Sequence, residues 1–222
     1  MSAKRIQRYK DAANGDTRKA MALYRYNLRL SQEMFTIVSC FEVALRNAID
    51  SLLVPSLGED WLKDSVQDTG IFSNGRMNET RKIIEKAYNR LNRQGNYSHS
   101  KLIAEMEFGV WKYMYSSLQY RATGQCLLRA FPNKPRSSAA VQYNNTYIFN
   151  ELDKVNSLRN RIAHHEPICF RLHEAEIDTS YIINEYQKIQ TLFSWMGIDS
   201  HSMLYGLDHV QSVCAKINSL KV

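Results

Sequence analysis

The segment between positions 159 and 165 concentrates side chains that could carry acid–base and phosphate chemistry. Its residues are Arg159, Asn160, Arg161, Ile162, Ala163, His164 and His165. Histidine titrates near neutral pH, so it can serve as a general base or a general acid. Arginine stays charged and its guanidinium can bind two phosphate oxygens at once, while asparagine can orient the imidazole or the phosphate. Metal-free RNA cleavage needs these groups: a base for the 2′-hydroxyl, an acid for the leaving 5′-oxygen and a cation for the phosphorane-like charge.

The spacing of these residues limits which of them can act together. On a continuous helix, residues four apart share a face, which pairs Asn160 with His164. Arg159 and His164 are five apart, so at ~100° per residue they lie about 140° apart around the helix and cannot face one phosphate. Either the helix unwinds before His164, which Pro167 would favour, or a second copy of the motif faces the first, and the two arrangements are compatible with each other. The second arrangement requires a homodimer with a composite site at its two-fold axis.

The same segment also has readings that involve no catalysis. Arg159, Asn160 and His164 could form a structural C-terminal cap, with cations near the negative end of the helix dipole. His164 and His165 with Glu166 could suggest a metal site. Adjacent histidines point in different directions on a helix, however, and the usual pair of histidines four apart is absent, so we expect no metal. His165 is interpreted as a support or phosphate contact, with a surface role as the alternative.

Three blocks of the sequence carry a resemblance to a known family. Arg159, Asn160 and His164 match the R-x4–6-H signature of the HEPN superfamily, including the polar residue after the arginine. The string RNRIAHHEPI at 159–168 resembles the Abi (abortive infection) proteins of bacteria, of the AbiD and AbiF type. Residues 41–49, FEVALRNAI, look like their first core helix, and residues 103–111, IAEMEFGVW, look like their central helix. Because the blocks occur in order, the resemblance extends over roughly residues 20–195.

This resemblance implies a fold, an activity and partners. The fold would be a single-domain, all-α, HEPN-type helical bundle with extra helices and loops, which dimerises to bring two motifs together. The activity would be a metal-independent endoribonuclease that leaves a 2′,3′-cyclic phosphate, uses no cofactor and acts as a toxin or effector in antiphage defence. Arg159 would clamp the scissile phosphate, Asn160 would orient it, and His164 would be the general base or acid. The implied partners are RNA, a second copy of the chain, and a cognate non-coding RNA or antitoxin that restrains it.

Five further residues are candidates for an accessory or RNA-binding role. Arg161 and His165 belong to the motif segment itself. Glu42, Arg46 and Asn47 lie on the expected first core helix, where the resembled family tends to place polar residues. Glu42 and Arg46 are four apart and could pair across one helix face. A buried ion pair that only holds helices together explains those two residues equally well.

In an alternative function, the motif contributes to RNA binding but the isolated chain does not cleave the RNA. The chain could be a catalytically silent protein that holds a specific RNA in the same basic groove, or a subunit that needs an activator. In both cases the arginines would still contribute to affinity, and affinity would fall steeply with salt. RNA recovered intact after tight binding would distinguish these readings from the endoribonuclease.

The composition is consistent with an all-helical protein that binds a polyanion. The chain has 222 residues, with Lys+Arg 29 against Asp+Glu 22, a formal net charge of +7, and only Gly 9 and Pro 4. Low glycine and proline favour helices over turn-rich β folds, and the basic balance favours a phosphate backbone as partner. No segment approaches the ~20 apolar residues of a membrane span, so we expect no membrane partner and a location in the bacterial cytoplasm. The four cysteines lie far apart, as in reduced thiols of a cytosolic protein.

The apolar pattern then places the elements that must position the motif. We expect a polar N-terminal segment at 1–16, partly ordered at best, followed by the helical domain at 17–222. The pattern predicts helices separated by two main loops at 56–77 and 118–136, with Trp61 as an anchor in the first loop. The expected helical segments are 17–55, broken by a cap at Ser31 and closed by Pro55; 78–93; one starting at Ser98 or Ser100 and running through 101–117; 138–163, capped by Ser137 or Ser138; 173–196; and 208–220.

Overall fold

The computed structural model describes residues 3–221 of the chain. About two thirds of the chain is helical, which confirms the all-α class. The described part contains no strand, and only Phe170 and Ile177 form an isolated antiparallel bridge. Contacts group the chain into two compact units. The first unit runs from the N-terminus to Phe41 and includes Ser157–Ser194 and the chain from Ile198 onward; the second includes Glu42–Asn156 and Trp195–Gly197.

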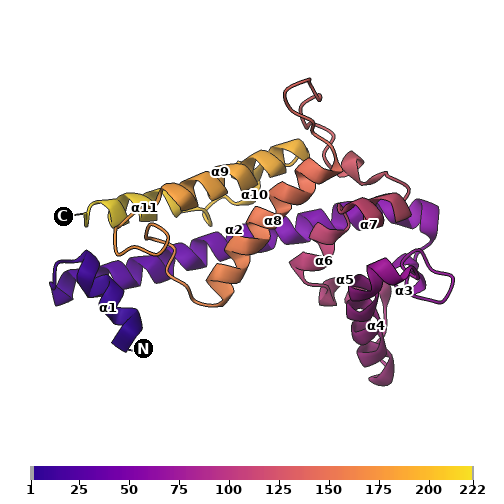
Figure 1. Cartoon of the computed structure of the whole chain (residues 1–222), viewed down its shortest axis with the longest axis horizontal. Coiled ribbons are helices and arrows are strands. Elements are labelled where there is room, and N and C mark those ends of the chain that lie inside the picture. Colours follow the sequence, from indigo (N-terminus) through magenta and orange to yellow (C-terminus); the bar gives the residue numbers. More distant parts are fainter. Residues whose placement is uncertain (1–2, 222) are drawn as a thin grey trace. The chain divides into compact units, whose positions relative to one another are not determined.

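Figure 1 shows the helices in chain order. They are α1 (Ala3–Ala12), α2 (Thr17–Leu57), α3 (Trp61–Asp64), α4 (Asn78–Arg93), α5 (His99–Glu105), α6 (Phe108–Tyr113), α7 (Ser117–Ala122), α8 (Asn145–Ala163), α9 (Ser180–Trp195), α10 (Ser200–Met203) and α11 (Val210–Asn218). Two short 3₁₀ helices are η1 (Gly75–Met77) and η2 (Leu127–Ala130). The boundary between the units cuts α2 and α8, so each of these helices contributes to both units.

The core of the first unit is built on the N-terminal part of α2. Its buried positions recur at threes and fours, as expected for one helix face that packs inward. These positions are Ala20, Leu23, Asn27, Leu30 and Met34. Figure 1 shows α9 running along this part of α2, and the rings of Phe41 and Phe193 join the two helices edge to face at a centroid distance of 5.2 Å. One of the five positions, Asn27, is polar.

The prediction that residues 1–16 are at best partly ordered is wrong for the described residues. They form α1 and a turn into α2. Tyr9 is almost fully buried, and its ring packs against Phe170 at a centroid distance of 5.1 Å. The Arg8 guanidinium donates to the carbonyl oxygen of Arg171 at 2.8 Å. One buried aromatic ring and one arginine therefore order a segment whose polar composition did not predict it.

Helix α2 also differs from the expected break at Ser31. It continues without interruption for 41 residues. Leu30 and Met34 are both buried on either side of Ser31, so packing on this face outweighs the local capping preference of serine. The prediction that Pro55 closes the helix is also wrong, because Pro55 lies in its last turn and the helix ends at Leu57. Gly58 follows with a φ of +94°, a conformation that glycine adopts at little cost.

In the second unit, the predicted helix at 78–93 and the Trp61 anchor are confirmed. Helices α3, α4 and α5 pack against one another. Trp61 is buried, and its Nε1 donates to Asp50 Oδ1 at 2.7 Å; the same oxygen lies 2.7 Å from His99 Nε2. The side chain of Ser98 accepts a hydrogen bond from the Lys101 N–H and caps α5, as expected from the sequence.

The single helix expected through 101–117 is instead divided into α5, α6 and the start of α7. Met106 and Glu107 are extended, with ψ of 130° and 159°. Met106 and Phe108 are both buried. Residues two apart on one helix point about 200° away from each other, so a continuous helix could not bury both side chains. The break between α5 and α6 resolves this conflict.

Two further helices begin later than predicted. Helix α8 begins at Asn145, because Ser137 and Ser138 bond backbone N–H groups within a loop rather than capping a helix. Asn144 takes the capping position and accepts from the Tyr147 N–H at 3.0 Å. Helix α9 begins at Ser180 rather than 173, since the preceding residues form the bridge of Ile177 with Phe170. The last helix, α11, agrees with the helix predicted at 208–220.

Candidate active site

The predicted motif lies at the C-terminal end of α8, in the first unit. The helix ends in a Schellman arrangement: the Glu166 N–H donates to the Arg161 carbonyl and the His165 N–H to the Ile162 carbonyl, both at 2.9 Å. His165 occupies the left-handed position of this cap, with a φ of +55°. Helices usually place glycine there. A histidine at this position turns the chain sharply just after His164.

The regular helix continues through His164. The His164 N–H donates to the Asn160 carbonyl at 2.9 Å, which is the usual helical bond between residues four apart. The left-handed step comes one residue later, so the expected unwinding before His164 is absent. Arg159 and His164 of one chain therefore keep the separation of about 140° that an ideal helix gives them.

The three predicted catalytic side chains have no partner within the described part of the chain. Arg159 is partly buried, whereas Asn160 and His164 are exposed. None of the three side chains forms a hydrogen bond or an ion pair with a described residue. The exposed end of α8 thus presents a guanidinium, an amide and an imidazole whose polar groups are unused by the fold.

Arg161 belongs to the same motif segment, but unlike the three predicted catalytic residues its side chain has partners within the fold. Only 19% of its side chain is exposed. Its Nη2 donates to the Pro167 carbonyl at 3.1 Å, and its Nε lies 3.4 Å from Glu166 Oε2. Its guanidinium carbon lies 4.9 Å from the ring centroid of Tyr181 on α9. Arg161 therefore holds the turn after His164 in place.

Tyr181 completes this brace. Burial raises the pKa of the Tyr181 hydroxyl, and a hydrogen bond with Arg161 lowers it by less. The phenol therefore remains protonated at neutral pH and offers the guanidinium an uncharged ring face. A guanidinium over an aromatic ring is a favourable contact, worth about 0.5–1 kcal/mol at exposed sites and more when desolvated.

Asn27 on α2 is a positioning residue that the sequence reasoning missed. Its side chain is buried, and Oδ1 accepts hydrogen bonds from the backbone N–H groups of Ile168 and Cys169, at 2.9 and 3.2 Å. These two residues directly follow Pro167, so Asn27 fixes the far end of the same turn. A signal was present: Asn27 is the polar residue within the apolar repeat of Leu23 and Leu30.

The other predicted accessory residues belong to the second unit. Glu42, Arg46 and Asn47 lie on the C-terminal part of α2; the first two are partly buried and Asn47 is exposed. The Arg46 Nε is buried without a hydrogen-bond partner among the described residues. Their contribution to the site of Arg159 and His164 remains a prediction. His165, also predicted as accessory, has an exposed side chain at the turn itself.

Two kinds of feature are absent from the described residues. Within residues 3–221, no three histidine, cysteine, aspartate or glutamate side chains come together as a metal-binding group. Among the described helices, none combines the length and the apolar composition needed to cross a bilayer.

The fold and the motif together define a class: an all-helical protein in which a long helix ends in an exposed Arg-Asn-x-x-x-His sequence. A model of the Abi-like protein family matches residues 2–169, from α1 to the residue pair that Asn27 anchors. The chain belongs to the Abi-like protein family, as the resemblance predicted. Searches of the curated proteins and of the solved structures found no match.

Proposed function

We propose that this chain is a metal-independent endoribonuclease of bacterial abortive-infection defence, with Arg159, Asn160 and His164 as its catalytic residues. Membership of the Abi-like family supports the defence role. The observation that carries the chemistry is the contrast within one turn of α8. Arg161 is committed to the fold, whereas Arg159, Asn160 and His164 are left without partners at the exposed end of the helix.

The proposed reaction uses only the chain's own groups. His164 removes the proton from the 2′-hydroxyl, and the resulting oxygen attacks the adjacent phosphorus. The bond from phosphorus to the 5′-oxygen breaks, and that oxygen takes a proton from the His164 imidazolium that the first step formed. A 2′,3′-cyclic phosphate remains. Arg159 binds the non-bridging oxygens and stabilises their growing charge. A positioned general acid or base typically contributes about 10²–10⁴-fold to such a rate.

The geometry of α8 favours a homodimer as the active unit. Arg159 and His164 of one chain diverge because the helix stays regular through His164. Two copies related by a two-fold axis would instead bring the Arg159 of one chain toward the His164 of its partner.

The proposal predicts RNA cleavage that survives a chelator and depends on the motif. A labelled single-stranded RNA is incubated with the full chain in EDTA, and the cleaved ends are tested for cyclic phosphate. We expect His164→Ala and Arg159→Ala to lower the rate at least about 100-fold, since each removes a group acting in the transition state. The matched controls are His201→Ala and Arg129→Ala, exposed residues outside the motif, which should cleave at the wild-type rate.

Three results would contradict parts of the proposal. Cleavage that persists in both motif variants would remove these residues from the active site. Cleavage that disappears in EDTA and returns with a divalent cation would contradict the metal-independent mechanism. Tight, salt-sensitive RNA binding with the RNA recovered intact would favour the silent RNA-binding protein instead.

A further inference from the structure

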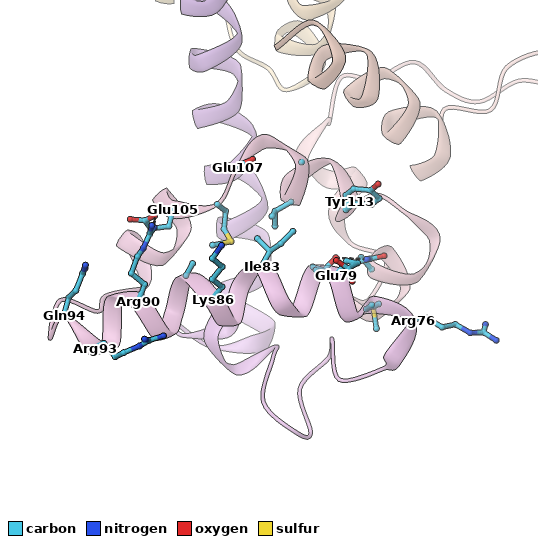
Figure 2. Close-up of a pocket in the computed structure, with 17 residues that line it drawn as sticks. Arg76, Glu79, Ile83, Lys86, Arg90, Arg93, Gln94, Glu105, Glu107 and Tyr113 are labelled. Carbon is cyan, nitrogen blue, oxygen red and sulfur yellow. Dashed lines mark hydrogen bonds and ion pairs between the residues drawn. The ribbon is translucent and has the colours of Figure 1, made fainter. Parts of the chain in front are cut away.

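The second unit contains a groove that neither the fold nor the proposed active site uses. It has a volume of about 940 Å³ and runs along one face of α4 (Figure 2). The α4 side of the groove repeats at threes and fours, so it is a continuous helix face. On α4 this face comprises Glu79, Thr80, Ile83, Lys86, Ala87, Arg90 and Arg93, with Arg76 of η1 before it and Gln94 after it. The opposite side comes from the segment of α5 and α6.

The inner surface of the groove is mainly apolar. Met77, Met106 and Val110 contribute buried side chains to its lining. Ile83 on α4 and Tyr113 on α6 are 46% and 47% exposed, which is unusual for side chains of this size in a folded unit. In Figure 2, Ile83 points from α4 toward the segment that carries Glu107. Exposed apolar surface of this kind, bordered by polar residues, marks an interaction site.

The charges along the groove are unequal on its two sides. Lys86, Arg90 and Arg93 are spaced at four and three residues and form a basic stripe on α4. Arg90 pairs with Glu105 across the groove, but Lys86 forms no hydrogen bond or ion pair with a described residue. The Arg93 Nε donates only to a backbone carbonyl of its own helix. Of the three acidic residues in the lining, Glu79 pairs with Lys82, Glu105 pairs with Arg90, and Glu107 lies on the opposite side. The α4 side therefore offers the unpaired positive charge of Lys86 and Arg93 beside an apolar floor.

We propose that this groove binds an amphipathic helix of a partner protein, with an apolar stripe flanked by acidic residues. The α4 part of this face, from Glu79 to Arg93, extends over roughly 21 Å at ~1.5 Å per residue, enough to hold several turns of a helix. Leucine-type side chains at positions i, i+4 and i+7 would cover Ile83, Met77 and Val110, as in other helix-in-groove complexes. Acidic residues beside that stripe would meet Lys86 and Arg93. Methionines in the lining suit an adaptable apolar contact.

The observations favour this occupant over two others. An RNA strand would meet an apolar floor with a single aromatic ring, Tyr113, whereas single-strand grooves combine a basic track with several stacking rings. A second copy of the chain would bring the same basic stripe against Lys86 and Arg93, and like charges oppose each other across an interface.

The test uses the full chain and a fluorescein-labelled 18-residue helical peptide, the length being an estimate of about five helical turns. The peptide carries leucines at i, i+4 and i+7 and glutamates beside them, and binding is followed by fluorescence anisotropy. We expect saturable binding that weakens at least about tenfold in Lys86→Glu/Arg93→Glu and in Ile83→Asp, through lost charge and apolar complementarity. Asn89→Glu is the control, because it adds a negative charge at an exposed position of α4 outside the groove lining and should bind as wild type.

A second peptide and a variant of the proposed active site serve as further controls for this binding experiment. The same apolar peptide with lysines in place of the glutamates should bind at least about tenfold more weakly. His164→Ala should bind the acidic peptide normally, so the groove and the proposed active site fail or succeed independently. No saturation by the acidic peptide would overturn the proposal. It would also be overturned if the groove variants lost RNA affinity or self-association while their binding of the acidic peptide stayed intact.

Discussion

Arg159 and Arg161 are two positions apart on α8, yet the fold uses only one of them. Arg161 binds the Pro167 carbonyl and lies over the Tyr181 ring, so Arg161→Ala removes a charge-assisted hydrogen bond and a cation–π contact. We expect it to lower the free energy of unfolding by about 1–3 kcal/mol. Arg159→Ala should change it by no more than about 0.5 kcal/mol, since it removes no partner. Urea unfolding of both variants measures the difference. Equal losses would mean that Arg159 is structural as well.

We expect the four cysteine thiols to differ in reactivity because they differ in burial. Burial raises the pKa of Cys169 to about 12 and that of Cys214 to about 11, while Cys40 and Cys126 are partly exposed. The thiolate is the reactive form, so the two buried cysteines stay protonated and shielded at pH 8. Iodoacetamide should modify only Cys40 and Cys126 in the native protein and all four in urea. Intact-mass spectrometry counts the adducts; rapid native labelling of Cys169 would contradict the burial.

At the scale of elements, α2 positions the end of α8 through one polar side chain. Asn27→Ala would leave the N–H groups of Ile168 and Cys169 buried without an acceptor. Each such group costs about 1–3 kcal/mol, so we expect a loss of about 2–4 kcal/mol in urea unfolding. Gln32→Ala, an exposed amide on the same helix, should stay within about 0.5 kcal/mol of wild type. A loss equal to that of Gln32→Ala would show that the turn does not depend on Asn27.

The elements also show what the sequence could predict and why. Helix α4 was predictable because its apolar period is local, and Ser98 because a capping serine acts on its own turn. The continuity of α2 at Ser31 was not predictable, since it depends on packing with residues far away in the sequence. The break after Glu105 arises for the same reason, from the need to bury both Met106 and Phe108.

The residues of the candidate site, like the helices, could be predicted only in part from the sequence. The motif residues were identified from their types and spacing, and the family match supports the resemblance that they carried. The roles of Asn27 and Tyr181 were not identified, because both act through tertiary contacts with the turn after His164. The sequence also offered two solutions for the divergence of Arg159 and His164. Only the backbone bond of His164 shows that the helix stays regular.

At the scale of the whole molecule, that divergence makes the proposed active unit a pair of chains. Each composite site would take Arg159 from one chain and His164 from the other. The net charge of +7 would assist the approach of RNA to such a dimer, and the rate of cleavage at low RNA concentration should fall as salt screens that charge.

Mixing the two inactive variants tests this arrangement directly. In a heterodimer of Arg159→Ala and His164→Ala, one composite site carries both lesions and the other carries neither. Random exchange of equal amounts makes half of the dimers mixed, and each has one intact site of two, so activity should return to about one quarter of wild type. A site formed within one chain would recover nothing, because every chain keeps a lesion. The mixture is compared with each variant alone at the same total concentration, after co-refolding to allow exchange. Recovery near one quarter would support the composite site, and absence of recovery in a confirmed heterodimer would exclude it.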